Sequence, residues 1–589
     1  MWIQPVDPLH NIVGSSLIAV TPIVILGALL LSRKVAGYIA CLITLALALV
    51  IAVFAYGMPI NLAGLSAIYG ILSGLLPIGW IVLAAVFLYN ISVASGSFAI
   101  VRDSIESITA DRRIQALLIA FCFGAFLEGA AGFGAPVAIT AGMLVGLGFA
   151  PLYAATICLL ANTAPVAFGG IGIAVVTAGT LTNLDPNVLS RMIGHQLPFI
   201  SLIIPLWLIV IIAGWRGARQ IWPAILVTGG AYAVTMFLTA SYAGPALPDI
   251  LSATVSLLCL VILLRFWRPA QVWRFPHESA ASTARAQTAK RLPRAVLVKA
   301  WLPFLLLIVF IANWAFSGTQ ALLSHVTVKI PFGALNHGIS VAGHAVPVSY
   351  SFVWLAAAGT AILLAALLSA VLLRLPVRIV TKVARDTLVE LRRPLITIMA
   401  IVGFAYVANY SGMSATLSHV LSATGHVFPL VAPLLGWLGV FITGSDTSSN
   451  ALFSSVQSHT AQTLGLNPVL TVASNSTGGV AAKMISPQSI AVAAAATKLT
   501  NQEGMLFRRT VLHSLALVSI ICVMTYLQAY YLTWMVPKAA PLGLAPLARF
   551  GVAEILTISI SLIVIAALAI VTVRTKPLAR ATTGKDQLA

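Results

Sequence analysis

Apolar runs of about 20 residues, separated by short polar segments, cover most of the chain. A run of that length forms an α-helix long enough to cross the roughly 30 Å hydrocarbon core of a bilayer. We therefore expect an all-α polytopic membrane protein with about thirteen spanning helices. Their starts lie near Asn11, Ala36, Ala67, Pro151, Gln196, Ala218, Pro248, Lys299, Tyr350, Pro394, Pro468, Val511 and Phe550.

Two pairs of apolar stretches do not fit as ordinary spans. Residues 114–127 and 135–149 form helices of 14 and 15 residues, about 21 to 23 Å long at 1.5 Å per residue, which is too short to cross. The turn between them runs from Glu128 to Gly134 and is rich in glycine. This pattern predicts a re-entrant hairpin over about 114–149. A second hairpin is predicted over about 427–464, around the polar turn 443–449.

The chain also repeats itself at an interval of about 315 residues, which indicates a duplicated structural unit. Four matches occur in the same order, with offsets of 315, 313, 316 and 318. They are Gly124-Ala125-Phe126-Leu127-Glu128-Gly129 with Gly439-Val440-Phe441-Ile442-Thr443-Gly444, Asn162-Thr163 with Asn475-Ser476, Ser95-Gly96 with Ser411-Gly412, and Arg191/His195 with Arg509/His513.

The basic residues set the expected orientation of these units. The net charge is +19, but Lys and Arg fall in short clusters between apolar runs, and such clusters mark cytoplasmic loops. With the N-terminus outside and the C-terminus in the cytoplasm, every cluster lies inside. The helix from Ala36 then runs outward and its counterpart from Tyr350 runs inward, so the two repeats are expected to have inverted topology. Paired inverted units are typical of secondary transporters in the cytoplasmic (inner) membrane.

This organisation divides the chain into five parts. The expected parts are an N-terminal spanning helix (1–35), repeat 1 (36–214, with a broken helix at about 151–181), connecting helices (215–349, with a basic cytoplasmic loop 268–298 and an external loop 318–348), repeat 2 (350–537, with a broken helix at about 468–497), and an extra C-terminal span and tail (538–589).

The helix after each hairpin is expected to be broken. Proline and glycine interrupt the first at Asn162-Thr163-Ala164-Pro165 and Gly169 to Gly172, and the second at Ser474 to Gly479 and Ser486-Pro487. Such breaks survive at membrane depth only where they are buried in protein or line a wet cavity. The N-termini of half-helices attract anions there, and freed carbonyl groups attract cations. The breaks and the hairpin tips are therefore expected to surround one transport site.

Few acidic residues fall within the predicted spans, and a carboxyl at membrane depth is unfavourable unless it is paired, hydrated or protonated. They are Glu128, Asp446 and, near a span end, Glu554. Glu128 could take up and release a proton, or it could be a hydrogen-bonded acid that holds the tip shut. Asp446 could carry a proton, coordinate a cation, or serve as the N-cap of the helix that follows it.

A single lysine, Lys483, lies deep in a predicted span. Its ammonium group needs an anionic partner, either a structural carboxylate or a substrate carboxylate in passing. The repeated pairs Arg191/His195 and Arg509/His513 lie near span ends, where arginine commonly anchors topology and histidine is commonly a hydrogen-bonded core residue. A gate or proton relay is the alternative for these four residues.

The expected site residues form four groups. They are proton-coupling Glu128 and Asp446; substrate-binding Asn162, Thr163, Ser474, Asn475, Ser476 and Lys483; hairpin-tip Gly129, Gly132, Gly134, Thr443, Gly444, Ser445, Thr447 and Ser448; and the possible gate Arg191, His195, Arg509 and His513. The sequence carries no motif for ATP phosphates, nucleophilic catalysis or metal ligation. We expect a transporter without a cofactor or metal rather than an enzyme. Nucleic acid is excluded as a partner, because the basic residues form no basic domain.

Several of these segments resemble the bacterial L-lactate permease family. They are residues 122–136, Asn162-Thr163-Ala164-Pro165-Val166-Ala167-Phe168-Gly169, residues 436–441 with 443–450, and Lys483-Met484-Ile485-Ser486-Pro487-Gln488-Ser489. The resemblance covers most of Met1 to Pro537, with divergence between Arg268 and Tyr350 and an extension from Phe550. It implies uptake of L-lactate, and of D-lactate and glycolate as further substrates, by proton symport. A sodium-coupled carboxylate symporter is the alternative, and a homo-oligomer in the lipid membrane is left open.

Overall fold

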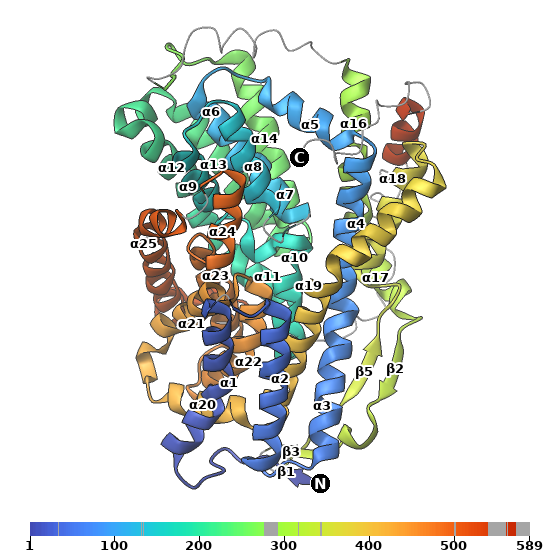
Figure 1. Ribbon diagram of the computed structural model, residues 1–589, viewed down its shortest axis with the longest axis vertical. Coiled ribbons are helices and arrows are strands. Elements are labelled where there is room, and N and C mark those ends of the chain that lie inside the picture. The colour runs from blue at the N-terminus through green and yellow to red at the C-terminus, as the bar shows by residue number, and fades with distance from the viewer. Residues whose placement is uncertain are drawn as a thin grey trace.

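The protein is elongated and consists mainly of helices packed side by side, as the computed structural model shows (Figure 1). The structure describes residues 1–32, 34–130, 132, 135–275, 293–315, 317–341, 344–499, 502–539, 561 and 563–572. Two expected residues, Gly134 at the first hairpin tip and Glu554, lie outside this part of the chain. Most of the predicted C-terminal span from Phe550 lies outside it as well.

Within the described residues, 11 helices are long and apolar enough to cross a membrane, or 12 if one bent pair counts as a span. This confirms an all-α polytopic membrane protein. The long helices are α1 (Ile12–Ser32), α2 (Gly37–Phe54), α3 with η1 and α4 (Ile60–Ala94), α6 with η2 and α7 (Arg112–Ala130), α12 (Leu197–Gln220), α13 (Trp222–Tyr242), α14 (Pro248–Phe266), α16 (Arg294–Ala315), α19 (Val377–Ser411), η5 with α21 (Gly425–Thr443) and α25 (Glu503–Tyr530).

The elements of the two halves follow one another in a similar order. In the first half, Gly96 with φ 76° follows α4 (Trp80–Ala94) and its C-cap Ser95, and in the second, Gly412 with φ 101° is the C-cap of α19. Glycine tolerates this left-handed conformation without a steric penalty. A short helix follows each, α5 (Ser97–Glu106) and α20 (Met413–Ser422). Next in each half come a helical pair and a broken helix. The inverted orientation of the two copies stays a prediction.

The span expected from Tyr350 begins later in the structure. Tyr350 lies in strand β5 (Ser349–Phe352), which pairs antiparallel with β2 (Val328–Pro331). The alternation in Ser349-Tyr350-Ser351-Phe352 suits a strand with one buried face, because successive side chains point to opposite faces. The helix that follows, α18 (Ala358–Leu372), has 15 residues. The expected loop at 318–348 therefore contains strands as well as helix α17 (Ser317–Ser324).

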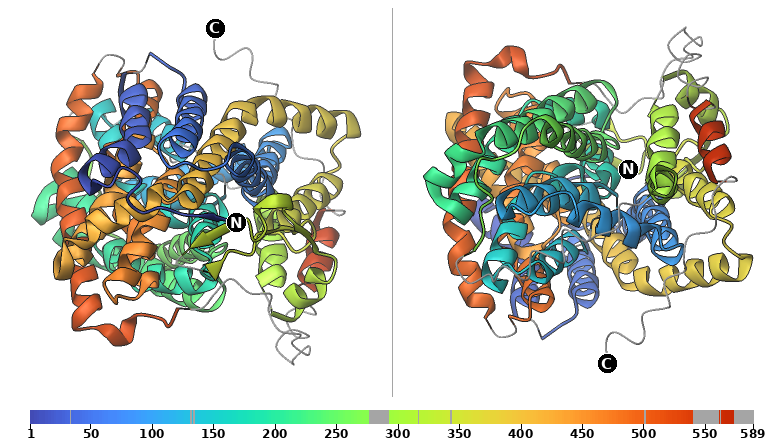
Figure 2. Two further views of the ribbon diagram at one scale, coloured as in Figure 1. Left: turned by 90° about the horizontal axis from the view of Figure 1, so that it is seen from below. Right: turned by 90° about the horizontal axis from the view of Figure 1, so that it is seen from above.

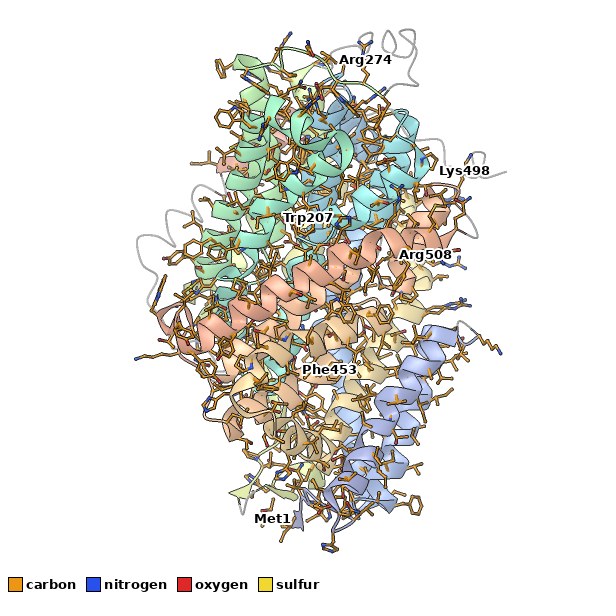
Figure 3. The ribbon with its side chains drawn as sticks, turned by 90° about the vertical axis from the view of Figure 1, so that its left-hand side faces the viewer. Met1, Trp207, Arg274, Phe453, Lys498 and Arg508 are labelled. Carbon is orange, nitrogen blue, oxygen red and sulfur yellow. The ribbon has the colours of Figure 1, made fainter. Side chains whose placement is uncertain are left out.

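A second small sheet joins this region to the N-terminal segment. Strand β3 (Ile339–Val341) pairs parallel with β1 (Trp2–Ile3) and antiparallel with β4 (His344–Ala345). Both sheets lie at the lower right of Figure 1, near the N-terminus. Met1 and Arg274 lie at opposite ends of the long axis (Figure 3).

Helices α16 and α18 stand along one side of the molecule with the helical segment 563–572 (Figure 2). Leu302 and Leu306 of α16 share a small apolar cluster with Ala365 of α18 and with Leu568. The main core is separate from this cluster and joins both halves of the chain, from Ala19 to Cys522. The site described below lies among the helices that form this larger core.

The first hairpin has a longer first arm than expected. Its helix is continuous from Arg112 to Ala130, 19 residues, and is fully buried. The helix starts earlier because the side chain of Asp111 caps it by accepting a hydrogen bond from the Arg113 N–H. Glu128 and Gly129 therefore belong to α7 (Gly124–Ala130), not to the turn. The second arm is α8 (Ala135–Gly146).

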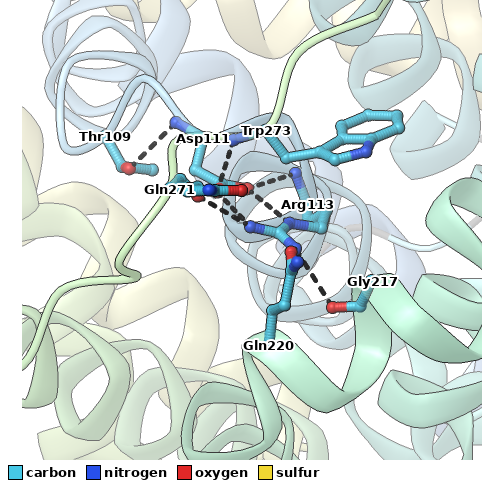
Figure 4. Close-up of polar contacts among 7 residues, drawn as sticks. All are labelled: Thr109, Asp111, Arg113, Gly217, Gln220, Gln271 and Trp273. Carbon is cyan, nitrogen blue, oxygen red and sulfur yellow. Dashed lines mark hydrogen bonds and ion pairs between the residues drawn. The ribbon is translucent and has the colours of Figure 1, made fainter.

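A buried ion pair fixes the base of this hairpin (Figure 4). Arg113 was counted among cytoplasmic topology markers, but its side chain is 0% exposed and lies 2.7 Å from Asp111. The guanidinium also donates to the Gly217 carbonyl, the Gln220 side chain and the Gln271 carbonyl. All five of its N–H groups can thus be satisfied, which burial of a charge requires.

The second hairpin consists of α21 (Phe428–Thr443) and α22 (Asp446–Thr463). Gly444, with φ 71°, ends the first helix, and Ser445 caps the second by accepting from the Ser448 N–H. Thr447 and Ser448, expected in the turn, lie in the first helical turn of α22. The tip is therefore only two residues long.

The two broken helices differ in where they break. The first is broken as expected: α9 (Pro151–Ala161) and the segment η3 with α10 (Val166–Thr182) meet at 64°. Gly170, Ile171 and Gly172 then take left-handed φ values of 55°, 62° and 71°, which is rare for a β-branched residue and typical of functional sites.

The expected break at Ser474 to Gly479 is wrong. Helix α23 runs unbroken from Pro468 to Lys483, and the interruption comes at Met484–Ser486, before α24 (Pro487–Ala496). The glycines allow close packing instead. A Cβ at Gly478 would overlap the Pro433 carbonyl of α21, and one at Gly479 would lie 2.5 Å from Asp446 Oδ1.

Candidate functional site

A small cavity of about 70 Å³ lies between the two hairpin tips and the broken helices. Its volume corresponds to roughly five water-sized positions. The residues that line it come from six helical elements and the two tips: Glu128, Gly132, Val166, Gly169, Gly170, Ile173, Ala174, Gly444, Ser445, Asp446, Thr447, Lys483 and Gln488. The structure thus brings together both expected proton-coupling carboxyls and the expected lysine.

Glu128 enters the cavity from the last turn of α7. It is 4% exposed, and its Oε2 accepts a hydrogen bond of 3.0 Å from the side-chain amide of Asn162. Its Oε1 lies against the start of α10, where a Cβ at Gly169 would come within 2.9 Å. Glu128 therefore lies near the C-terminal end of its helix, the negative end of the helix dipole.

Asp446 lies at the first position of α22 and is also 4% exposed. Neither carboxyl oxygen has a hydrogen-bond partner within the described residues. The N-cap role considered for Asp446 is wrong, because Ser445 occupies that position. Asp446 therefore lies at the N-terminal end of its helix, the positive end of the helix dipole.

Lys483 closes the cavity at the C-terminal end of α23 and is 7% exposed. Its Nζ donates a 2.8 Å hydrogen bond to the Gly444 carbonyl at the second tip. Among the described residues, no ion pair within 4.0 Å joins Lys483 to either cavity carboxyl. A permanent structural salt bridge, one of the two roles considered for this lysine, is therefore not formed.

The N-termini of three helices meet at the cavity. Ile173 and Ala174 begin the regular part of α10, after the left-handed residues 170–172. Asp446 and Thr447 begin α22, and Gln488 lies in the first turn of α24. The first N–H groups of a helix have no partner within it, and together with the helix dipole they attract anions. The arrangement can therefore hold a carboxylate beside the ammonium of Lys483.

These N-termini are not the ones expected. Asn162 is the C-cap of α9, and Asn475 and Ser476 lie within α23, so the idea of half-helix N-termini at these positions is wrong. The positions of the N-termini depend on where the helices actually break, after Phe168 and after Lys483.

The remaining residues expected to bind substrate surround the cavity without lining it. Asn475 donates to Asn450 of α22 and accepts from Gln457, and the Ser476 hydroxyl accepts from Asn450. The Ser474 hydroxyl contacts Thr525 of α25 at 3.1 Å. These bonds hold α23 against its neighbours. The Thr163 hydroxyl and the Asn162 Oδ1 are buried without a partner. Direct contact of these residues with a substrate stays a prediction.

The tip residues have distinct structural roles. Thr443 donates to the Gly439 carbonyl and accepts from the Ser445 N–H. Gly132, with φ 59°, packs against the start of α10, and Gly129 packs against α14, where a Cβ would lie 2.8 Å from Asp249 Cβ. Substitution at either glycine would displace the tip from its neighbours.

The four possible gate residues lie away from the cavity. Arg191 donates to the Ser241 carbonyl, and His195 contacts the Met535 carbonyl and lines a separate apolar groove between α12 and α13. Arg509 lies over the Tyr153 ring at 5.1 Å, and His513 accepts from the Trp207 indole at 3.1 Å. The structure places all four in peripheral contacts, and their gating role stays a prediction.

One buried acid was missed in the sequence. Asp249 lies in the first turn of α14 and is not among the acids expected within the spans, but it is 1% exposed. Packing of α14 against α7 covers it. Pro248 before it and the apolar run after it gave no sign of this contact, which depends on the fold. Among the described residues, no group of three or more His, Cys, Asp or Glu side chains could hold a metal ion.

Comparison with known proteins identifies the family. The family model for L-lactate permease matches residues 15–532. This chain belongs to the L-lactate permease family. The L-lactate permease of Bacillus subtilis is 49% identical over 562 residues, which cover 91% of this chain and 100% of that protein. The glycolate permease GlcA of Escherichia coli is 46% identical over 559 residues, covering 91% and 99%.

Membership of the L-lactate permease family makes the chain a transporter rather than an enzyme. Among solved structures, the YdaH transporter of Alcanivorax borkumensis covers 79% of this chain and 86% of its own, with 16% identity and a TM-score of 0.42.

Proposed function

We propose that this protein takes up L-lactate, and also D-lactate and glycolate, by symport with a proton across the cytoplasmic membrane. The named activities of its relatives, an L-lactate permease and a glycolate permease, support the substrate class. In the proposed arrangement, the N-terminus is outside and the two inverted repeats each contribute one hairpin to a shared site.

The observation that carries the proposal is the set of ionisable groups on the cavity wall. Glu128, Asp446 and Lys483 together carry a formal charge of −1 when all are ionised. An anion entering a small, poorly solvated cavity of that charge would be repelled. A proton on one carboxyl brings the sum to zero, so the proton and the substrate anion bind best together.

The two carboxyls have different roles in this scheme. Glu128 lies at the end of α7 and carries the proton, whereas Asp446 at the start of α22 stays ionised. The substrate carboxylate is held by Lys483 and by the N–H groups that begin α10 and α24. The substrate hydroxyl lies toward the hairpin tips, where it can donate a hydrogen bond to a backbone carbonyl group.

Symport also fits the energetics of uptake. A lactate anion entering alone works against about 2.3 kcal/mol per 100 mV of inside-negative potential. One accompanying proton cancels the charge, and the pH gradient then drives uptake.

The test is uptake of radiolabelled L-lactate into proteoliposomes under imposed gradients. A gradient of one pH unit, acid outside, should drive about tenfold accumulation at zero potential if one proton accompanies each lactate. Replacement of sodium by choline should leave the uptake unchanged, and unlabelled D-lactate and glycolate should compete. Uptake that follows a sodium gradient and ignores pH would support the sodium-coupled alternative and contradict the proposal.

A further inference from the structure

Asp249 is a buried carboxyl that the proposed cycle has not yet used. It lies beside Gly129, the residue that follows Glu128, so the two acids flank one position of the first hairpin tip. Glu128 lines the cavity and Asp249 does not. The tip therefore lies between Glu128, which can contact a substrate in the cavity, and Asp249, which is outside the cavity.

Asp249 has few polar contacts. Its Oδ1 is 3.4 Å from the Tyr232 hydroxyl of α13, and its Oδ2 has no hydrogen-bond partner within the described residues. The titratable groups that face it from the packed elements are Glu128 of α7 and Tyr232 of α13, and Cys122 of η2 lies near Tyr232. No described Lys, Arg or His forms an ion pair with it.

A polar row continues from Asp249 along α14. Asp249, Ser252 and Ser256 are spaced i, i+3 and i+7, so they share one helix face over about 10 Å. All three are buried, and the Ser252 hydroxyl has no hydrogen-bond partner among the described residues. The Ser256 hydroxyl donates to the Thr228 carbonyl and contacts Cys122 at 3.4 Å. Burying a polar group that lacks a hydrogen bond is unfavourable, and an ionisable residue retained within a span commonly marks a functional site.

We propose that Asp249 is a second proton-holding residue of the transport cycle, which takes the proton from Glu128 across the hairpin tip when the substrate leaves the cavity. In this step the Glu128 acid becomes a carboxylate and the Asp249 carboxylate becomes an acid, so the charge of the pair stays at −1. Neither carboxyl forms an ion pair within 4.0 Å among the described residues, and two neighbouring buried carboxyls then favour this single-charge state, because a second ionisation would place like charges together.

This inference rests on the proposed symport but makes its own prediction. Asp249→Asn is neutral and nearly isosteric, so the tip can keep its packing while the proton acceptor is lost. In proteoliposomes, pH-driven accumulation should fall from about tenfold per imposed pH unit to no accumulation, while lactate exchange at equal pH stays at the wild-type rate. Asp185→Asn is the matched control, since Asp185 caps α11 (Pro186–Gly194) away from the cavity; it should behave as wild type.

Tyr232→Phe provides a second, milder test that does not depend on Asp249→Asn being stable. Removing the hydroxyl that donates to Asp249 disfavours the ionised carboxyl, so Asp249 keeps its proton to higher pH. The pH of half-maximal uptake should then rise, while the KM for lactate stays constant because neither residue lines the cavity. A purely structural role would not move the pH profile.

The outcomes separate this inference from the proposed function. If the wild-type protein shows no pH-driven accumulation, the symport itself is wrong. If the wild type accumulates lactate and Asp249→Asn does the same with an unchanged pH profile, Asp249 is not a proton acceptor. Should Asp249→Asn fail to purify as a folded protein, an unaltered pH profile of Tyr232→Phe would overturn the inference.

Discussion

Each hairpin brings one carboxyl to the cavity. The first carboxyl lies at the C-terminal end of a helix, and the second lies at the N-terminal end of another helix. In the first hairpin, Glu128 lies in the last turn of α7 and accepts from the Asn162 amide. In the second, Asp446 begins α22, and neither of its carboxyl oxygens has a hydrogen-bond partner within the described residues. Glu128 thus lies at the negative end of one helix dipole and Asp446 at the positive end of another. In our proposal, the two tips divide the tasks of holding a proton and holding a charge in this way.

The bases of the hairpins differ as well. The first hairpin starts at the buried Asp111–Arg113 pair, which also binds the segment around Gln271 (Figure 4). The second hairpin has no such ion pair within the described residues. Its attachment comes instead from the side-chain amides of Asn450, Gln457 and Asn475. The first hairpin is therefore fixed mainly at its base, and the second along its length.

The largest expected effect distinguishes the two carboxyls. Glu128→Gln should abolish pH-driven accumulation of lactate while exchange at equal pH continues, because the amide cannot carry a proton. Asp446→Asn should keep pH-driven accumulation, because Asp446 stays ionised through the cycle. Both are measured as radiolabelled uptake in proteoliposomes. Loss of coupling in Asp446→Asn, with coupling retained in Glu128→Gln, would reverse the assigned roles.

The next effect concerns the base of the first hairpin. Arg113→Ala leaves the Asp111 carboxylate buried without its partner, so the free energy of unfolding should fall by about 3 to 5 kcal/mol. Denaturant unfolding of the purified protein in detergent measures this loss. The control is Thr463→Ala at the base of the second hairpin, where only a hydroxyl bond to the His459 carbonyl is removed. Equal losses for the two variants would contradict the difference between the bases.

A smaller effect is expected at Lys483, the proposed ligand of the substrate carboxylate, which donates to the Gly444 carbonyl at the second tip. Lys483→Ala removes a charged hydrogen-bond donor, which is worth about 1.5 to 3 kcal/mol, so the KM for lactate should rise roughly ten- to hundredfold. The exposed Lys498→Ala is the matched control and should keep the wild-type KM. If Lys483→Ala instead yields unfolded protein with no binding-competent fraction, the lysine is structural.

The smallest effect tests the cap of α22. Ser445→Ala removes the side-chain acceptor for the Ser448 N–H and should lower the free energy of unfolding by about 1 kcal/mol. Ser445→Asp retains an acceptor and should restore most of this loss. Thermal unfolding of both variants provides the measurement. If the cap affects only stability, both variants should show the same pH dependence of uptake as the wild type.

Much of the site could be predicted from the sequence because its chemistry depends on residue types that are rare within membrane spans. Glu128, Asp446 and Lys483 stand out in apolar surroundings, and the structure brings all three to one cavity. The first broken helix was also predictable, since Pro165 and the following glycines cannot continue a regular helix.

Other features depend on packing that local sequence does not reveal. Gly478 and Gly479 look like helix breakers, but they make room for α21 and Asp446 inside an unbroken α23. In the sequence, Asp249 stands at the start of an apolar run. Its burial depends on the contact between α14 and α7, which the local sequence does not reveal. Strand β5 has only four residues and directly precedes an apolar run, so in the sequence it resembles the start of a span, and its partner β2 is contributed by another segment.

The most direct test of the shared cavity follows protons and lactate together. Proteoliposomes loaded with a fluorescent pH indicator, at equal pH on both sides, receive an inward lactate gradient without sodium. The account predicts that the lumen acidifies as lactate enters the wild-type liposomes, and that Glu128→Gln liposomes exchange lactate without acidification. Lactate entry through the wild-type protein with no acidification would contradict it.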